Sequence, residues 1–488
     1  MDFILEALSK RYKTYRERAL KKNSKCAGSC EFIHMKVGLV VPHIFMHKDI
    51  LPSVIFSPAE LALSLAEGID SDQTEIILYT PGPTDTKVKN ITADLGKFEE
   101  ELKGRGDSYL DLLKKHPFTF VTLARQVQSE IIARAYQDAN DDKLDIVHIY
   151  TNEEDTALPF AKLCNKPVLF THHDPFNFLV KYKNVFPKYP ELNWISMSYA
   201  QRKGMPENTN WVANIYHGID ENVFTPTDNP SNDYIAYVGR IIKPKGLHLA
   251  IDAIKQYNKQ AGANLKLKIA GKHYSGHKKD KYWQEEIKPR LGEDIEYLGY
   301  ISNKEKKREF LANAKALIVP SIFEEPFGLV LIEALACGTP VIGLNSGAIP
   351  EIIQDSKNGL LINKKFKVAD SIAPAIQNLS VLGDELSETK SLLSEGGVSN
   401  DTPSEETSFL TAQARLKRQV LYCGGYKLLD QKLVANNLAT AIKNVDSISR
   451  QTCREDFLER FTAKRMCQEH LNLYKRLHND QVGLDSRV

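Results

Sequence analysis

Short apolar runs alternate with longer amphipathic stretches along most of this chain. In the first half the apolar runs are residues 35–42 (MKVGLVVP), 75–80, 145–150, 167–173 and 193–198. A helical pattern, PAELALSLAEGI, lies between the first two runs, and another over residues 122–140 precedes the third. Strands that alternate with helices in this way are typical of a doubly wound parallel sheet.

The same alternation starts again after residues 214–233, a segment rich in Pro, Asn and Asp that reads as a linker. The later apolar runs are residues 234–240, 265–271, 295–300, 316–321, 340–345 and 359–363. We therefore predict an α/β protein with two Rossmann-like domains. Ligands of such sheets bind beyond the carboxyl ends of the strands, so the cleft between the domains is the expected site.

The predicted domain boundaries follow these patterns. They are 1–34, an N-terminal extension; 35–220, the first Rossmann-like domain; 221–365 with 433–460, the second; 366–432, an insertion; and 461–488, a C-terminal helix and tail. The insertion is polar, acidic and poor in aromatic residues, which predicts that it is disordered in part.

The N-terminal extension carries its apolar residues Leu5, Leu8, Tyr12, Tyr15 and Ala19 at helical spacing, with basic residues on the other face. We interpret it first as a helix that docks on its own domain or on a partner. Contact of residues 1–25 with an anionic membrane surface is the alternative.

Composition and charge exclude several classes of protein. The chain has 488 residues, 42% of them hydrophobic, and its 64 Lys+Arg nearly balance its 62 Asp+Glu. A formal charge of +2 gives no reason to expect nucleic acid as a partner. The sequence contains no apolar run of membrane-spanning length and no signal-peptide pattern. Seven scattered cysteines predict neither a disulfide framework nor a zinc set, so we expect a reduced, cytoplasmic protein.

Common phosphate-binding motifs are missing. The GxGxxG of dinucleotide-binding domains would follow the first strand, but the chain has no glycine between Gly38 and Gly68, and it has no GxxxxGK[ST]. The second domain instead offers Gly239-Arg240 at the end of a predicted strand, with Lys245 shortly after it. Two cations beside a helix N-terminus can hold a diphosphate. The alternative is ordinary surface charge.

The stretch SIFEEPFGLVLIEALACGTPVIG places two glutamates eight positions apart, Glu325 in a loop and Glu333 in an apolar helix. We predict that the helix begins near Phe327, which puts Glu333 about 9 Å further along its axis. That is the scale of a diphosphate. A carboxylate accepts hydrogen bonds from two hydroxyl groups, so each glutamate can hold one sugar of a nucleotide-sugar. A capping or solvent-facing role is the alternative for Glu333.

Six motifs occur in the order of a known family: FTHHDP, ISMSYAQRK, IYHGID, YVGRIIKPKGLHLAI, IEYLGYIS and PSIFEEPFGLVLIEALACGTPVI. With them the chain resembles the family 4 retaining glycosyltransferases of the GT-B fold, the group 1 glycosyltransferases that include glycogen synthase and sucrose-phosphate synthase. The resemblance covers residues 35–477 apart from the insertion. It implies an N-terminal acceptor-side domain and a C-terminal nucleotide-sugar-binding domain.

The resemblance also implies catalytic roles. Arg240 and Lys245 match the cations that neutralise the donor diphosphate. Glu325 matches the glutamate that contacts the transferred sugar. His173 matches the N-terminal-domain histidine near that sugar, with His172 as the fallback.

Further positions match donor-binding residues of the family. Glu333 matches the glutamate on the ribose, and Gly239 precedes the first cation. The backbone of Phe327, Gly328 and Leu329 matches the segment that cradles sugar and phosphate, and Tyr300 and Ile301 lie where the base is read.

The implied activity is transfer of a hexose, with retention, from a nucleotide-sugar to an acceptor that the sequence does not identify. A UDP-sugar is the favoured donor and a GDP-sugar the second; a saccharide, a lipid-linked molecule or a small molecule can be the acceptor. The resemblance implies no cofactor and no metal, so we do not interpret the DSD at residues 70–72 as a metal site. The loop after the first strand lacks the family's glycines, and no donor contact is assigned to it. A nucleotide-sugar epimerase and a non-catalytic scaffold are the alternatives.

Overall fold

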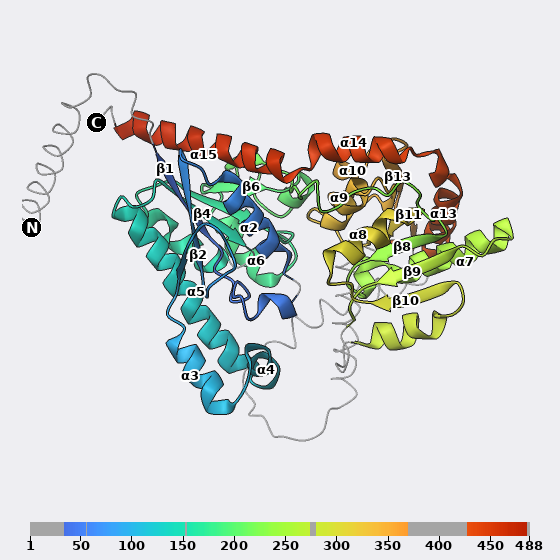
Figure 1. The fold of residues 1–488 in the computed structure, drawn as a ribbon, viewed down its shortest axis with the longest axis horizontal. Helices are drawn as coiled ribbons and strands as arrows, with labels where there is room; N and C mark the ends of the chain where they lie inside the picture. The colour runs from blue at the N-terminus through green and yellow to red at the C-terminus, as the bar shows by residue number, and fades with distance from the viewer. Residues whose placement is uncertain (1–33, 55, 152–153, 274–279, 369–426, 486–488) are drawn as a thin grey trace, which may run out of the picture.

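The structure is a computed structural model that describes residues 34–54, 56–151, 154–273, 280–368 and 427–485. Two α/β domains lie side by side (Figure 1). Helix α15 (Ala463–Asp485) runs along the first domain, and α14 (Arg450–Arg460) along the second.

In the described part of the first domain the strands form one parallel sheet with the order β3-β2-β1-β4-β5-β6-β7. The strands are β1 (Met35–Val40), β2 (Thr74–Thr80), β3 (Lys89–Thr92), β4 (Ile146–Thr151), β5 (Val168–His172), β6 (Asn193–Ser196) and β7 (Trp211–Asn214). The helices are α2 (Ser57–Ile69), α3 (Gly96–Arg105), α4 (Tyr109–Lys115), α5 (Pro117–Asn140) and α6 (Val180–Val185).

The second domain repeats this architecture with the strand order β10-β9-β8-β11-β12-β13 among its described residues. These strands are β8 (Tyr234–Val238), β9 (Lys266–Ala270), β10 (Ile295–Gly299), β11 (Ala316–Val319), β12 (Val341–Leu344) and β13 (Gly359–Ile362). Its helices are α7 (Leu247–Ala261), α8 (Lys304–Ala312), α9 (Leu329–Ala336), α10 (Ile349–Ile352), α13 (Gln431–Asn444) and α14. The predicted fold class is therefore confirmed.

The differences from the predicted elements have local causes. Strands β3 and β7 were not predicted; β3, with the sequence KNIT, lies at the sheet edge, and neither strand is fully buried. Helix α5 begins at Pro117 rather than at residue 122, since proline is favoured in the first turn of a helix. Helix α9 begins two residues after Phe327, because Gly328 has a φ of 105°, which does not continue a right-handed helix.

The last helix, α15, returns to the first domain and completes its core. Met466, Leu473 and Tyr474 are buried with β1, β4 and α2 in one apolar cluster. The fit to α2 is close, because a Cβ on Gly68 would lie 2.6 Å from Cys467 Sγ. The pattern predicted this helix, but not that it belongs to the first domain's core.

The chain thus crosses between the domains twice, and the two crossings pair with each other. Ile219 N–H donates to Phe461 O (3.0 Å), and Ala463 N–H donates to Ile219 O (2.8 Å). Glycine is required at position 218, because a Cβ there would lie 2.1 Å from Thr462 O. The predicted linker is therefore one half of a two-stranded hinge.

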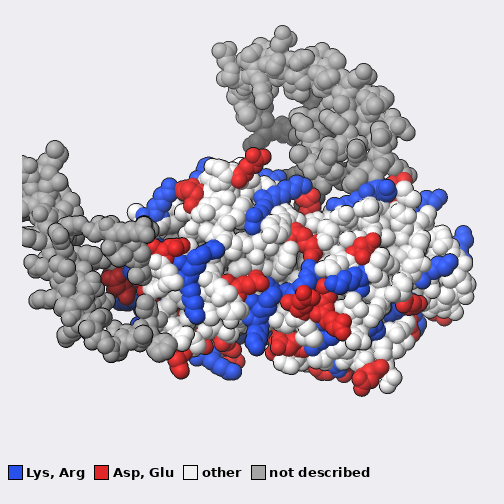
Figure 2. Space-filling view, turned by 90° about the horizontal axis from the view of Figure 1, so that it is seen from above, with Lys and Arg blue, Asp and Glu red and all other residues white. Residues whose placement is uncertain are grey.

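The predictions for residues 1–33 and for most of the insertion, 369–426, lie outside the described residues. At the base of the insertion β14 (Phe366–Val368) and β15 (Lys427–Leu429) pair antiparallel. No helix in the described part of the chain is both long and apolar enough to cross a membrane. On the face shown in Figure 2 basic and acidic side chains are intermixed, as the balanced composition predicts.

Candidate active site

The strand order of the second sheet brings the two predicted donor-binding loops together. Strands β8 and β11 are neighbours, although β9 and β10 separate them in sequence. The connections after β8 and β11 therefore run in opposite directions along the sheet, and ligands of α/β sheets bind at such a point, beyond the carboxyl ends of the strands. Residues 239–246 follow β8 and residues 320–328 follow β11, so both loops lie at this point.

The loop after β8 presents the two predicted cations. Arg240 is exposed; its backbone carbonyl accepts from the Tyr237 hydroxyl (3.2 Å), while its guanidinium group has no hydrogen bond or ion pair to another described residue. Lys245 ends a single 3₁₀ turn (Lys243–Lys245). Gly246 follows with a φ of 72°, and a Cβ there would lie 2.0 Å from Pro320 O, so the turn touches the loop after β11.

Lys245 and Glu325, which the sequence assigned to diphosphate and sugar, bind each other. Lys245 Nζ lies 2.6 Å from Glu325 Oε1 and 2.8 Å from Oε2. Ser321 Oγ donates to the same Oε1 at 2.6 Å. Both charged side chains are largely buried, at 19% and 8% exposed. Because burying either charge alone is costly, the pair is the expected arrangement without a ligand, and a diphosphate would have to replace the carboxylate at Lys245.

The backbone around Glu325 is held by a second loop. Ala348 N–H donates to Glu325 O (2.8 Å). Gly347 has a φ of 55°, and a Cβ on it would lie 2.3 Å from Glu325 O and 2.4 Å from Glu325 N. Glycine at position 347 therefore permits a close approach of the two loops, and this contact fixes the position of the Glu325 backbone.

Phe327, Gly328 and Leu329 lie at the start of α9, where the first backbone N–H groups have no acceptor inside the helix. The Phe327 side chain is 1% exposed and packs against His217 (ring centroids 4.9 Å apart). The phenyl ring therefore anchors the loop, and only the backbone of this residue is available to a donor.

Glu333 also has a lysine partner. Lys307 Nζ of α8 lies 2.7 Å from Glu333 Oε1 and 2.6 Å from Oε2, and Glu333 is 8% exposed. The alternative that Glu333 faces solvent is therefore wrong. One buried Lys–Glu pair thus lies just before α9, and a second lies in the second turn of this helix. The roles assigned to the two glutamates stay predictions.

Tyr300 and Ile301 directly follow β10, as predicted for the base end of the site. Gly299 has a φ of 78°, and its carbonyl accepts a hydrogen bond from Gly271 N–H (2.8 Å). Gly271 in turn lies against Gly239, since a Cβ on it would be 2.1 Å from Gly239 O. The ends of β8, β9 and β10 therefore form one continuous edge.

The first domain contributes His173, at the end of β5. Its ring stacks on His217 with 5.2 Å between centroids and 8° between planes. Since His217 contacts Phe327, one intervening ring connects His173 to the loop of residues 320–328, which we call the donor loop. His172 is fully buried and packs against Phe176, Tyr182 and Phe186. The geometry therefore favours His173 over the fallback.

These histidines are neutral near pH 7. Burial, with further contributions from His217 and His172, lowers the pKa of His173 well below its ordinary value. Burial, with His470 and then Arg465, lowers the pKa of His217 to about 3. An imidazole in this state can exchange hydrogen bonds with sugar hydroxyls without adding charge to the cleft.

The sequence analysis missed Lys307, Ser321 and His217. Lys307 precedes the buried residues Phe310 and Leu311 by three and four positions, so helical spacing places it on the inner face of α8 and could have indicated it. His217 and Ser321 lie inside motifs that were recognised, but no local pattern distinguishes them.

No group of three or more His, Cys, Asp or Glu side chains among the described residues has the arrangement of a metal site. At the DSD segment, Asp70 Oδ1 accepts from Ile76 N–H (2.9 Å) where α2 turns into β2. This is the amino end of the strand, opposite the cleft, so Asp70 has a structural role.

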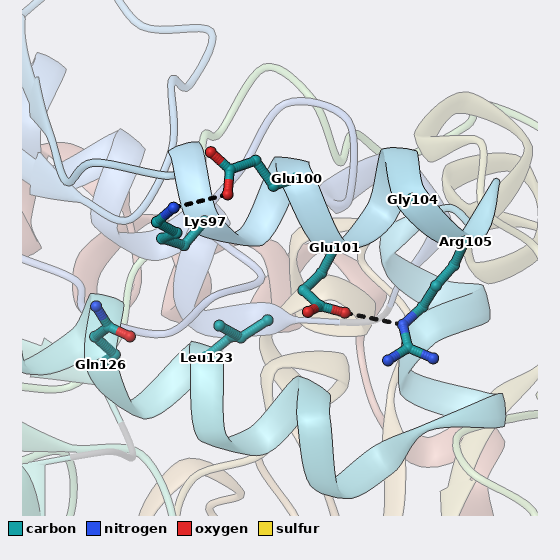
Figure 3. A pocket seen from close by; sticks show the side chains of 7 residues that line it. All are labelled: Lys97, Glu100, Glu101, Gly104, Arg105, Leu123 and Gln126. Atoms are coloured by element: carbon teal, nitrogen blue, oxygen red, sulfur yellow. Dashed lines mark hydrogen bonds and ion pairs between the residues drawn. The ribbon is translucent and has the colours of Figure 1, made fainter.

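A surface hollow between α3 and α5 shares no residue with the predicted site (Figure 3). Its charged groups pair with each other, Lys97 with Glu100 (2.8 Å) and Arg105 with Glu101 (3.0 Å). It therefore offers no unpaired charge to a ligand.

Comparison with known proteins agrees with this geometry. Residues 219–389 match the family of glycosyl transferases group 1. An alpha-maltose-1-phosphate synthase of Mycolicibacterium smegmatis is 28% identical over 168 residues, 30% of this chain and 41% of that protein. A D-inositol 3-phosphate glycosyltransferase of Paenarthrobacter aurescens is 32% identical over 162 residues, 30% of this chain and 38% of that protein. The chain thus spans about two-fifths of these relatives.

Solved structures share the whole architecture. A sucrose-phosphate synthase from Thermosynechococcus elongatus superposes with a TM-score of 0.55 over 91% of this chain and 100% of that one, at 17% identity. Anabaena HepE, solved in complex with UDP and glucose, gives a TM-score of 0.53 with the same coverage, at 15% identity. The chain therefore has the GT-B fold, and its residues 219–389, which include the paired glutamates, match the family of group 1 glycosyl transferases.

Proposed function

We propose that this protein is a retaining glycosyltransferase that moves a hexose from a nucleotide-diphosphate sugar to an acceptor hydroxyl. The observation that carries the proposal is the buried Lys245–Glu325 pair beside the exposed Arg240, where the loops after β8 and β11 meet. A UDP-sugar is the preferred donor, which the UDP bound to the similarly folded HepE supports. The acceptor stays open between a saccharide, a lipid-linked molecule and a small molecule.

Donor binding exchanges the partners of Lys245. The diphosphate takes the place of the carboxylate at the ammonium group, and Arg240 supplies a second cation. Glu325 is then released from Lys245, keeps the Ser321 hydroxyl and accepts hydrogen bonds from the sugar. At the other end Glu333 binds the ribose hydroxyls, while Lys307 compensates its charge.

In the transfer step the bond from the anomeric carbon to the diphosphate oxygen breaks, and its electron pair leaves with the diphosphate. The acceptor oxygen forms the new bond on the same face, and its proton passes to the departing phosphate. Arg240 and Lys245 stabilise the negative charge that develops there. Because two side-chain cations supply this stabilisation, we propose that the reaction needs no metal or other cofactor.

We also propose that the protein works in a reducing compartment, the cytoplasm, with contact of residues 1–25 to the inner face of a membrane as an open alternative. Cys164, Cys337, Cys453 and Cys467, the cysteines in the described residues, are all free thiols, which supports this placement.

The test is release of free nucleotide from a panel of UDP- and GDP-sugars, with calorimetry of UDP binding. Lys245→Met should weaken UDP binding by about 1.5–3 kcal/mol, since a charged hydrogen-bonding partner is lost. The matched control is Lys243→Met, on the same turn, whose partner Glu286 (2.8 Å) belongs to neither of the two loops; its UDP affinity should stay within about twofold of wild type.

Three results would contradict the proposal. Absence of UDP and GDP binding favours the non-catalytic scaffold. Conversion of a nucleotide-sugar without release of free nucleotide favours the epimerase. Equal effects of the two lysine variants would show that the Lys245–Glu325 pair is structural.

A further inference from the structure

The turn after β6 joins the two domains at the donor loop through one buried hydroxyl. Ser198 belongs to the first domain and is 0% exposed. Its Oγ donates to Pro326 O at 2.7 Å. Pro326 stands between Glu325 and Phe327, so this bond holds the donor loop from the other domain.

A second buried side chain of the same turn holds the backbone around His173. Gln201 is 2% exposed, and its Nε2 donates to His172 O (2.6 Å) and to Asp174 O (3.1 Å). These carbonyls flank His173 on both sides. Gln201 Oε1 accepts from Met197 N–H (3.0 Å), so both ends of the amide group are engaged.

The two side chains are directly linked. Gln201 N–H donates to Ser198 Oγ (3.0 Å), and the same hydroxyl donates to Pro326 O. A continuous path of hydrogen bonds therefore runs from the carbonyls on either side of His173 through Gln201 and Ser198 to the donor loop. Because each member is shielded from water, its bonds are stronger and more directional than at the surface.

We propose that Ser198 and Gln201 are positioning residues that set His173 against the donor loop when the domains are closed. The proposal rests on the proposed function, since it assigns the pair to the same reaction. Both side chains use their polar groups within the path, so they orient other groups rather than touch the substrate. Loss of a group that fixes reacting geometry to within about 1 Å can lower a rate by up to about 100-fold.

The chain provides a matched control two residues earlier. Ser196 is also 0% exposed, and its Oγ donates to Asn214 Oδ1 (2.7 Å) and accepts from Arg202 Nε (2.9 Å). All of these partners lie in the first domain. Ser196→Ala thus removes the same atom from the same kind of environment without touching the donor loop.

The experiment compares Ser198→Ala, Gln201→Met, their double variant and Ser196→Ala by UDP calorimetry, steady-state release of UDP from the preferred UDP-sugar, and thermal unfolding. Ser198→Ala and Gln201→Met should each lower kcat roughly tenfold, with KM and the Kd of UDP within about twofold of wild type. The double variant should lose little more than the worse single variant, because both changes break one path. Ser196→Ala should lower the thermal midpoint about as much as Ser198→Ala does, but it should keep the kcat of the wild type.

The proposal is overturned if Ser198→Ala lowers kcat no more than Ser196→Ala does, or if the two losses multiply in the double variant. Loss of UDP affinity in parallel with kcat would also overturn it, since that shows a donor loop that is merely destabilised. Gln201→Met carries the same test should Ser198→Ala be insoluble. If the wild-type protein turns over no nucleotide-sugar, the proposed function is contradicted, and the positioning role with it. If the wild-type protein is active and the variants keep its kcat, only the positioning role is contradicted.

Discussion

Acid should destabilise the first domain because histidines lie buried and neutral where α15 docks. His148 and His470 are 0% and 2% exposed, with 5.7 Å between their ring centroids. His148 Nδ1 lies 2.7 Å from the hydroxyl oxygen of Tyr474 on α15, and its Nε2 lies 2.8 Å from Thr171 Oγ1. Burial, together with the neighbouring His470, lowers the pKa of His148 well below its ordinary value. Burial also lowers the pKa of His470 to about 4.

The sign follows from proton uptake. Above the ordinary pKa of 6.5 a histidine is neutral in both the folded and the unfolded chain, so it contributes no pH dependence. As the pH falls below that value the unfolded chain binds a proton that the folded chain refuses, and stability is lost until the pH reaches the folded pKa. Between pH 7 and pH 5, His470 and His217, with pKa values of about 4 and 3, each lower the free energy of unfolding by about 2 kcal/mol. A combined loss of about 4 kcal/mol is large beside a typical stability of roughly 5–15 kcal/mol.

Urea unfolding at pH 7, 6 and 5, followed by tryptophan fluorescence, measures this loss. Two of the protein's three tryptophans, Trp194 and Trp211, lie in the first domain. In His470→Leu the decrease between pH 7 and pH 5 should shrink by about 2 kcal/mol, whatever the variant's stability at pH 7. His116→Asn, at an exposed position, should keep the full decrease. An unchanged decrease in His470→Leu would refute the reasoning.

Three further outcomes are expected. Glu333→Gln should weaken binding of free UDP and of the nucleotide-sugar alike, by about 1.5–3 kcal/mol, whereas Glu325→Gln should lower kcat with nearly unchanged UDP affinity. Calorimetry and steady-state kinetics measure the two effects, and the reverse pattern would exchange the roles of the two glutamates. Gly347→Ala should lower UDP affinity, because its Cβ would displace the Glu325 backbone and with it the adjoining backbone from Phe327 to Leu329, to which the phosphate contacts are assigned. Gly262→Ala has a φ of 61° and no atom within 4 Å of the new Cβ, so it should only destabilise the protein, by about 1 kcal/mol of backbone strain; equal UDP affinities in the two variants would contradict this. Donor turnover should persist in excess EDTA, and activity that returns only with Mg²⁺ or Mn²⁺ would contradict the metal-free reaction.

The sequence by itself was enough to predict the two-domain α/β fold and that the two loops of the candidate site lie at the carboxyl edge of one sheet. Buried parallel strands are continuous apolar runs, so β8 and β11 were recognisable, and the charged residues directly after them had to lie at the carboxyl edge of the sheet. Edge strands such as β3 lack that signal, because burial does not select their residues.

Only the tertiary structure decided which groups pair. Lys245 and Glu325 are 80 residues apart, and Ser198 and Pro326 are 128 apart, so no local periodicity relates them. The same holds for α15, whose amphipathic pattern predicts a buried face but not that this face closes the core of the first domain. Spacing along the chain reports which side of an element is buried, whereas the partner across that face depends on how the sheets and the hinge fold in three dimensions.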